Sequence, residues 1–186
     1  WGCFLRPDGL TQSQMDLMAK AGLTHIEFGS DSLTDSVLES YGKGFTFDDV
    51  YHSSEYAKNA GVHYAHFLII GGPGETKRTL EESFLNAQKL KRTVFFPYIG
   101  MRVYPQTPLN TWALEEKAID EDTDLLKPFF YVTPEMTLSE IEEMLIEFRK
   151  KKPNWYYGEM SDAMVKVMNG LRQKGVVGPL WEFLCR

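Results

Sequence analysis

Short apolar runs alternate with amphipathic stretches along the first half of the chain. The apolar runs cover residues 1–5, 25–29, 63–70 and 94–101, and each has the length of a single strand. The stretches between them space their apolar residues as a helix packed on one side does. Strands that alternate with helices are typical of parallel βαβ units. Right-handed crossovers lead from such units either to an open doubly wound sheet or to a barrel.

Residues with helix-capping properties mark the ends of these helices. Thr11 and Gln14 have the spacing of a capping box. Glycines at the far ends suit the left-handed position that follows a helix. The predicted helices run from Thr11 to Gly22, from Thr46 to Gly61 and from Thr76 to about Lys91.

The pattern changes after Asp120. Thr137 and Glu140 have the spacing of another capping box, and a helical stripe follows them. We predict a second helix over Ser161–Lys174 and a short one over Pro179–Leu184 that packs back on the domain. Their methionine and aromatic stripes are interpreted as core packing. The chain is thus divided into a barrel-like part, 1–120, and a helical extension, 121–186, packed on it.

Composition narrows the class of protein. The 186 residues suit one domain, and the net charge of −6 without a long basic run does not indicate nucleic-acid binding. No run of about 18 apolar residues that would span a membrane is present, and no signal-peptide pattern is visible. The two cysteines make no disulfide framework, which favours a reducing, cytoplasmic setting.

Sites in parallel α/β folds gather at the carboxyl ends of strands, and the second predicted strand ends unusually. It runs into Gly29, Ser30, Asp31 and Ser32. A carboxylate there suits a ribose diol, to which it offers charge-assisted hydrogen bonds. Equally, Asp31 or Ser32 caps a short helix over 33–40.

The third and fourth strand ends are rich in glycine and proline. Gly71 and Gly72 open the turn 71–76, where they allow a flat ring to lie against the backbone. The amides of the next helix make an anion site there, although the lysine of a phosphate-binding loop is absent. The same turn is equally explained as an economical connection capped by its own residues. The segment 103–109 carries two prolines and forms an extended strap that either walls a pocket or binds nothing.

Taken in order and at their spacings, these segments resemble the radical S-adenosylmethionine (SAM) superfamily over roughly residues 1–120. The segments are FGSDS at 28–32, VLESYGKG at 37–44, AGV at 60–62, GGPGET at 71–76 and YPQTPL at 104–109. The resemblance implies an α/β fold, a six-stranded partial (βα) TIM-like barrel. This chain would supply about four parallel strands of it, beginning with the third, plus the C-terminal helical extension.

The resemblance also implies a set of SAM-binding positions. Asp31 stands where the family usually carries the glutamate of its ribose-binding motif, and Ser32 follows it. Lys43 stands at a basic position that in some members reaches the carboxylate of SAM. Gln106 replaces a frequent glycine, so the shape of that turn departs from the family pattern. The implied cofactor-binding residues are Asp31, Ser32, Lys43, Leu68, Ile70, Gly72, Val103 and Tyr104.

One family feature is missing from the chain. The family holds a 4Fe-4S cluster with three cysteines in a C-x-x-x-C-x-x-C loop, and neither Cys3 nor Cys185 has that spacing. The chain also begins without methionine, in what reads as a buried strand. We therefore expect a fragment, inactive alone, of a parent that cleaves SAM reductively to a 5′-deoxyadenosyl radical. The helical tail loosely resembles that of cobalamin-binding members, which makes cobalamin a further candidate cofactor of the parent.

The substrate is an unknown small molecule, and inward-facing residues of the later strands would contact it. The candidates are His66, Tyr98, Met101 and Arg102, although His66 fits a core position equally well. Two alternative functions are a non-catalytic scaffold barrel and an α/β enzyme that binds a phosphorylated metabolite at Gly71–Thr76. Because a partial barrel has open strand edges, we expect the first strand and the inner face to contact a second copy or to stay solvent-filled.

Overall fold

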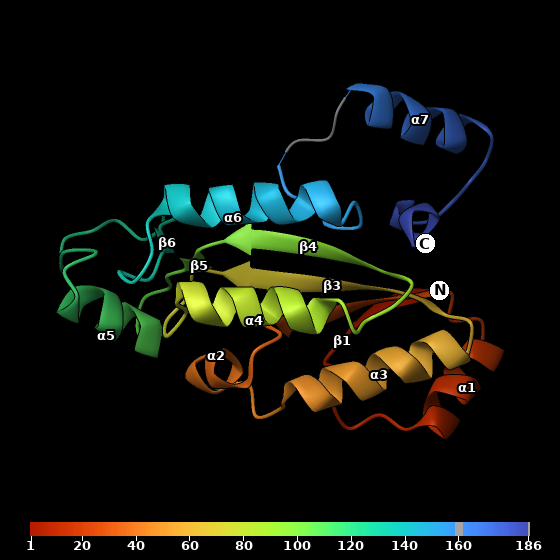
Figure 1. The fold of residues 1–186 in the computed structure, drawn as a ribbon, viewed down its shortest axis with the longest axis horizontal. Helices are drawn as coiled ribbons and strands as arrows, with labels where there is room; N and C mark the ends of the chain where they lie inside the picture. Colours follow the sequence, from red (N-terminus) through yellow and green to blue (C-terminus); the bar gives the residue numbers. More distant parts are fainter. Residues whose placement is uncertain (159–161, 186) are drawn as a thin grey trace.

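The computed structural model describes residues 1–158 and 162–185, and its centre is a four-stranded parallel sheet in the order β1-β2-β3-β4 (Figure 1). The strands are β1 (Gly2–Leu5), β2 (His25–Asp31), β3 (His63–Ile70) and β4 (Thr93–Ile99). The first helices are α1 (Gln12–Lys20), α2 (Asp35–Ser40), α3 (Phe47–Asn59) and α4 (Lys77–Ala87). Spatial order equals sequence order, so every crossover moves one strand in the same direction, as it does in a (βα) barrel. The predicted α/β fold of about four parallel strands is confirmed.

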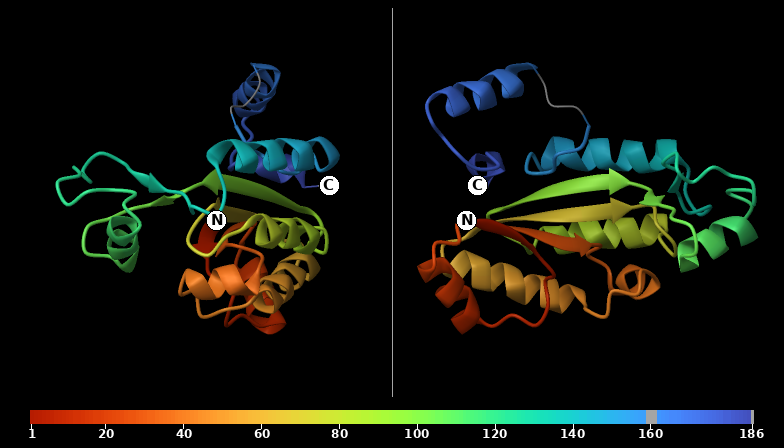
Figure 2. Two further views of the ribbon diagram at one scale, coloured as in Figure 1. Left: turned by 60° about the vertical axis from the view of Figure 1, so that its left-hand side comes forward. Right: turned by 180° about the vertical axis from the view of Figure 1, so that it is seen from behind.

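The second half of the chain lies around β4 and the carboxyl ends of the strands. Its elements are β5 (Met101–Arg102), α5 (Pro108–Glu115), β6 (Phe130–Tyr131), α6 (Leu138–Lys151), α7 (Asp162–Gln173) and the 3-10 helix η1 (Trp181–Leu184). The strands β5 and β6 pair antiparallel and lie with α5 beyond the strand ends (Figure 1). In contrast, η1 lies at the amino ends of the strands, and α7 stands off from the sheet (Figure 2).

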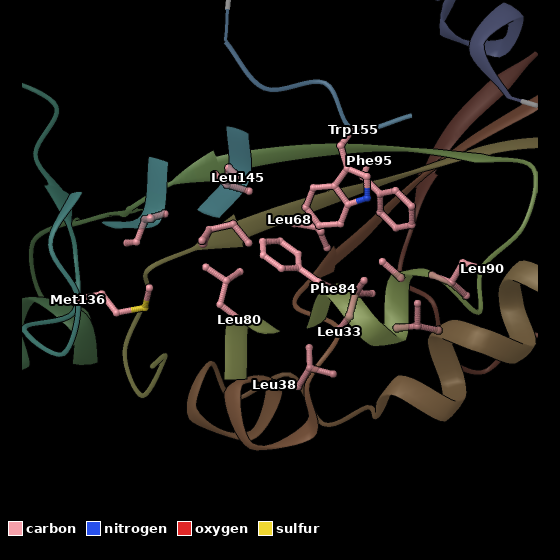
Figure 3. Close-up of a cluster of buried hydrophobic side chains, with 14 of the residues drawn as sticks. Leu33, Leu38, Leu68, Leu80, Phe84, Leu90, Phe95, Met136, Leu145 and Trp155 are labelled. Carbon is pink, nitrogen blue, oxygen red and sulfur yellow. The ribbon is translucent and has the colours of Figure 1, made fainter. Parts of the chain in front are cut away.

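Helices cover one face of the sheet and enclose most of the core. Met15 of α1 and Ala57 of α3 pack on Ile26, Phe28 and other residues of β2 and β3. A larger cluster joins β3 and β4 to α4 and α6 (Figure 3). It includes Leu68, Leu80, Phe84, Phe95, Ile141, Leu145 and Trp155. The other face of the sheet is covered at its amino end by Trp181, which contacts Ala65 and Val94.

The predicted helix caps are present. The amide of Thr11 donates to Gln14 Oε1 at 2.9 Å, and the amide of Thr137 donates to Glu140 Oε2 at 2.8 Å. Thr46 is the N-cap of α3, as expected. Each contact satisfies a backbone donor that the first helical turn leaves without a partner.

Three expectations about the elements were wrong. Helix α4 ends at Ala87, four residues before Lys91. The fourth predicted strand is interrupted at Gly100, whose φ of +83° turns the chain into the separate strand β5. The stripe on α7 is not core packing, because α7 has no buried residue among those described. The predicted helix start, Ser161, lies outside the described residues.

The extension after residue 120 shares the main core through α6, and the two-part division at that point stays a prediction. No helix in the described part of the chain has both the length and the apolar surface needed to cross a membrane.

Candidate functional site

Asp31 occupies an unusual backbone conformation at the carboxyl end of β2. Its φ is +58°, in the left-handed region that residues with a side chain rarely adopt. The amide of Ser32 donates to the carbonyl of Ser30 at 2.6 Å, which closes a three-residue γ-turn around Asp31. The register between β2 and β3 shifts at the same place. Such a conformation costs on the order of 1–3 kcal/mol and marks a position that its surroundings hold in place.

The turn directs the Asp31 carboxylate toward Lys43. The Lys43 ammonium forms an ion pair with Asp31 Oδ2, and the two side chains are 31% and 16% exposed respectively. Arg6, at the end of β1, donates to the carbonyl of Lys43 at 3.1 Å and also pairs with Asp8. Asp31 and Lys43, both implied by the family resemblance, therefore lie together at the carboxyl end of β2.

Ser32 has a local structural role. It is 2% exposed, and its hydroxyl accepts the amide of Thr34, the N-cap of α2, at 3.3 Å. The Thr34 hydroxyl in turn donates to the carbonyl of Thr79 at 2.9 Å and contacts Ser83. Ser32 therefore orders the turn before α2 without being its N-cap, while Asp31 keeps its carboxylate at the strand end. This buried polar link from α2 to α4 was not visible in the sequence.

The Gly71–Thr76 turn is closed by a buried carboxyl group. Glu75 is fully buried, and its Oε2 accepts the amide of Gly71. Its Oε1 has no hydrogen-bond partner among the described residues. Burial raises the pKa of Glu75 to about 7, although the hydrogen bond from Gly71 opposes this shift. The side chain thus fastens the two ends of the turn.

Tyr41 occupies the space that the missing side chain of Gly72 leaves. The Tyr41 hydroxyl donates to the carbonyl of Ile69 at 3.2 Å and accepts the amide of Gly72 at 3.1 Å. A Cβ atom on Gly72 would lie 2.3 Å from the Tyr41 oxygen. We expected Gly72 to leave room for a flat ring. That expectation was wrong, because the glycine accommodates Tyr41 of the same chain.

The start of α4 offers little to an anion. The amide of Thr76 donates to the Thr79 hydroxyl at 2.9 Å, and the amide of Thr79 donates back to Thr76 at 3.3 Å. Two of the amides that a phosphate would use are therefore satisfied within the helix. A carboxyl group, Glu75, is buried directly before them. This arrangement favours a self-capped turn over a phosphate site.

The candidates on β3 point away from the open face of the sheet. Leu68 and Ile70 are each 1% exposed in the core beneath the helices. Their side chains therefore face the helices and not the open face, and the assignment of this strand to the SAM site stays a prediction. Because side chains alternate along a strand, Phe67 and Ile69 face the open side. Gly29 on β2 is exposed there as well, with no atom within 4 Å of the position of a Cβ.

His66 is a core residue and does not face a substrate. Its Nδ1 lies 2.8 Å from the Ser30 hydroxyl and its Nε2 lies 3.2 Å from the Ser54 hydroxyl. The ring stacks between Phe28 and Phe95, with centroid distances of 5.5 Å to each. Complete burial lowers the pKa of His66 to about 3, so the imidazole is neutral at pH 7. The core alternative for this residue is confirmed.

The remaining candidates lie on β4 and beyond it. Val103 is fully buried in a small cluster with α5, and its amide donates to the carbonyl of Phe129 at 2.9 Å. Met101 packs against the same cluster. Arg102 lies over the ring of Tyr104 at 4.7 Å, and both are exposed. Tyr98 is 57% exposed and stacks on Phe67, which places it on the open face.

The described residues do not fit an iron–sulfur cluster. No group of three or more His, Cys, Asp or Glu side chains among them could hold a metal ion. Cys3 packs against the core under α1, and burial raises the pKa of its thiol. The Cys185 thiol lies 3.9 Å from the carbonyl of Tyr64, and burial raises its pKa to about 11. Ligand thiolates need the opposite shift.

Comparisons with known proteins link the chain to radical SAM proteins. Residues 3–86 match the model of the radical SAM superfamily. The chain is 29% identical over 119 residues to the uncharacterized methyltransferase PH0819 of Pyrococcus horikoshii, covering 61% of this chain and 26% of that protein. It is 30% identical over 102 residues to the heme chaperone HemW of Bacillus subtilis, covering 54% of this chain and 27% of that protein.

A solved structure shares the fold across nearly the whole chain. The radical SAM methyltransferase TsrM from Kitasatospora setae, determined with cobalamin and a 4Fe-4S cluster bound, superposes with a TM-score of 0.76. The identity is 20%, and the match covers 96% of this chain and 41% of that one. The chain thus spans about a quarter of the curated relatives and less than half of TsrM. The family match itself is confined to residues 3–86, which carry the strands β1 to β3 and the Asp31 site.

Proposed function

We propose that this chain forms the SAM-facing and substrate-facing side of a radical SAM catalytic barrel. The observation that carries the proposal is the strained turn at Asp31, which aims a carboxylate at the carboxyl end of the sheet beside Lys43. When SAM and a reduced cluster are bound, the family chemistry supplies a 5′-deoxyadenosyl radical. In this proposal the cluster is held by residues outside this chain, and the chain alone is inactive.

Asp31 has the chemistry to orient the ribose of SAM. Its Oδ2 is engaged by Lys43, and Oδ1 has no hydrogen-bond partner among the described residues. A carboxylate oxygen accepts a charge-assisted hydrogen bond from a ribose hydroxyl. Lys43 fixes the carboxylate, and its own ammonium offers a second contact to an anionic group of the ligand. The exposed backbone of Gly29, on the same strand, leaves room for the ligand to approach.

The proposal includes the class of reaction that the whole protein catalyses. Methyl transfer with cobalamin is the candidate we favour, because the match to TsrM includes nearly the whole chain. PH0819, a methyltransferase by name, supports the same class. We also propose a reducing, cytoplasmic setting, since Cys3 and Cys185 are free thiols.

Binding of SAM to the 186-residue chain tests the proposal. We expect isothermal titration calorimetry to detect SAM binding, and Asp31→Asn to weaken it about tenfold through loss of a charged hydrogen bond. Asp122→Asn, at an exposed loop position, is the matched control and should bind as the unmodified chain does. Equal affinities of the chain and Asp31→Asn, or no SAM binding at all, would contradict the proposal.

A second experiment tests the predicted inactivity. The chain is incubated with iron, sulfide, dithionite and SAM, and 5′-deoxyadenosine is measured by chromatography. We expect no product and no stable 4Fe-4S absorption. Formation of both would show that the chain holds its own cluster and would overturn this part of the proposal.

A further inference from the structure

A cavity of about 720 Å³ lies along β4, on the side of the sheet away from α1 and α3. Residues from β2, β4, α6 and η1 line it, and Met168 of α7 closes one side. Its volume falls within the range of about 300–1,000 Å³ that is typical of small-molecule sites. None of the residues assigned to SAM lines this cavity, so it is distinct from the Asp31 site.

Aromatic rings form one wall of the cavity. Phe96 and Tyr98 of β4 line it directly, and Phe67 of β3 stacks on both. The Phe67 ring lies 5.0 Å from Phe96 and 6.1 Å from Tyr98, with interplanar angles of 28° and 12°. Tyr98 is 57% exposed, so its ring remains accessible. Near-parallel rings with an accessible face suit a planar aromatic ligand, which gains by offset stacking.

A single carboxylate from β2 reaches the same cavity. Trp181 of η1 donates its indole N–H to Glu27 Oε1 at 3.0 Å, and Trp181 is itself 5% exposed. The hydrogen bond holds Glu27 in one orientation at the wall that Trp181 forms. No Lys, Arg or His among the described residues makes an ion pair with Glu27. A half-buried carboxylate without an ion-pair partner favours a ligand that supplies one.

Hydrogen bonds within the protein connect the residues of the opposite rim. Arg149 of α6 donates to the carbonyl of Tyr157 at 2.7 Å, and the Tyr157 hydroxyl donates to Glu142 at 3.0 Å. These groups line the cavity, but they hold one another across the rim. Arg149 is exposed whereas Glu27 is half-buried, so solvent screens the charge of Glu27 less, and charge recognition is assigned to Glu27.

We propose that this cavity is the substrate pocket, and that the substrate is a planar aromatic molecule carrying an amine or similar cationic group opposite Glu27. The proposal deepens the proposed function and rests on it. Glu27 precedes Asp31 by four residues on β2, which is about 13 Å along an extended strand. A substrate anchored at Glu27 would thus extend along β4 past Tyr98, toward the strand ends where SAM is proposed to bind.

Three small probes test separately the contribution of the ligand's charge and that of its aromatic ring. The probes are 2-naphthylmethylamine, 2-naphthoate and cyclohexylmethylamine, and their affinities for the 186-residue chain are measured by ligand-observed NMR titration. We expect the aromatic amine to bind at least tenfold more tightly than either of the others. Equal binding of naphthoate would assign recognition to Arg149, and equal binding of the cyclohexyl amine would remove the role of stacking. Either result would overturn the proposal.

Two variants test whether the aromatic amine binds at Glu27 and Tyr98. Glu27→Gln keeps an acceptor for Trp181 and should weaken the aromatic amine about tenfold by removing a charged hydrogen bond. Tyr98→Leu, at an exposed ring, should weaken both naphthalene probes. Glu81→Gln, on the exposed face of α4, is the control and should change nothing. Unchanged amine affinity in both Glu27→Gln and Tyr98→Leu would refute the assignment.

SAM titrations of the same variants keep the two proposals separable. Glu27→Gln and Tyr98→Leu should bind SAM as the unmodified chain does, because neither residue contacts Asp31 or Lys43. If the unmodified chain binds SAM but shows no preference for the aromatic amine, the pocket proposal alone is overturned. Absence of SAM binding with intact amine selectivity would overturn the proposed function while leaving a ligand site at Glu27.

Discussion

Glu75 and His66 are both fully buried, and burial affects their charges in opposite ways. The pKa of Glu75 is raised to about 7, because the carboxylate loses solvation and the hydrogen bond from Gly71 offsets only part of this loss. The pKa of His66 is lowered to about 3, because the imidazolium would lose solvation. Both groups are therefore neutral in the folded chain between about pH 3 and pH 7.

The two shifts give opposite dependences of stability on pH. Glu75 binds a proton more tightly in the folded state than in the unfolded state. Its contribution is thus complete below about pH 4.5 and is lost as the pH rises through 7. His66 binds a proton less tightly in the folded state. Its contribution is complete above pH 6.5 and is lost as the pH falls toward 3.

We predict that Glu75→Gln removes the loss of stability that Glu75 causes above pH 5. The free energy of unfolding is measured by urea titration from pH 4.5 to 8.5 for the chain and for the variant. The difference should shift in favour of the variant by about 2–3 kcal/mol across this range, since folding raises the pKa of Glu75 from 4.5 to about 7. Any constant cost of the amide group drops out of this comparison.

Glu81→Gln, an exposed substitution on α4, should follow the unmodified chain at every pH. A pH-independent difference between Glu75→Gln and the chain would mean that Glu75 is ionised in the fold throughout. The closure of the Gly71–Thr76 turn would then need another explanation.

For single residues, the sequence indicated candidate site positions, but it did not show where their side chains point. Asp31 and Lys43 were identified because an ordered set of motifs points to them. The left-handed φ of Asp31 was hidden, since nothing in its local sequence requires it. The sequence left the face of His66, Leu68 and Ile70 open, because the strand 63–70 lacks a clear alternation of apolar and polar residues. Tyr41 filling the space at Gly72 is a contact between distant segments, which no local pattern encodes.

At the scale of elements, aromatic packing fixes α6 to the sheet. Phe148 of α6 stacks on Phe84 of α4 with ring centroids 4.2 Å apart. Trp155 follows α6 and contacts Phe84 and Phe95 with centroid distances of 5.4 and 4.9 Å (Figure 3). It also contacts Phe148, with a centroid distance of 5.1 Å. Trp155 is 2% exposed. The indole therefore joins α4, α6 and β4 in one buried contact.

Trp155→Ala should lower the free energy of unfolding by about 3–5 kcal/mol, because it leaves a cavity at this junction. Guanidinium unfolding followed by circular dichroism measures the change. Trp112→Ala, at a position 38% exposed on α5, is the control and should cost much less. A loss with Trp155→Ala no greater than with Trp112→Ala would mean that α6 is an independent appendage, which would support a boundary at residue 120.

Capping residues and periodicity predicted where most helices and strands begin, but they did not predict how α7 packs. Capping residues and apolar spacing placed β3 and the starts of α1, α3 and α6 within a residue or so. A helical stripe shows which residues share a face, but it cannot show what the face meets. On α7 that face carries Met168, which borders the cavity and is not buried in a core. The β5–β6 pair was missed because each strand has two residues, too few for a pattern.

At the scale of the whole molecule, the two edges of the sheet differ. Beside β4, the amide of Phe95 donates to the carbonyl of Asn154 and the amide of Tyr156 donates to the carbonyl of Phe95, both at 2.9 Å. This edge is therefore partly covered by the segment after α6. The other edge is β1, which pairs with β2 alone among the described strands. Its central Phe4 is 77% exposed.

An uncovered strand edge next to an exposed aromatic ring favours association. We predict that the chain self-associates through β1, and that sedimentation velocity will show a dimer fraction that grows with concentration. Phe4→Lys should shift the equilibrium toward monomer, since a charge at an edge strand opposes pairing. Val177→Lys, at a position 91% exposed and outside every strand of the sheet, should leave the equilibrium unchanged. A chain that stays monomeric at every concentration would show that β1 and the open face tolerate solvent. In that case the same edge would still be available to strands of the larger protein that we propose as the parent.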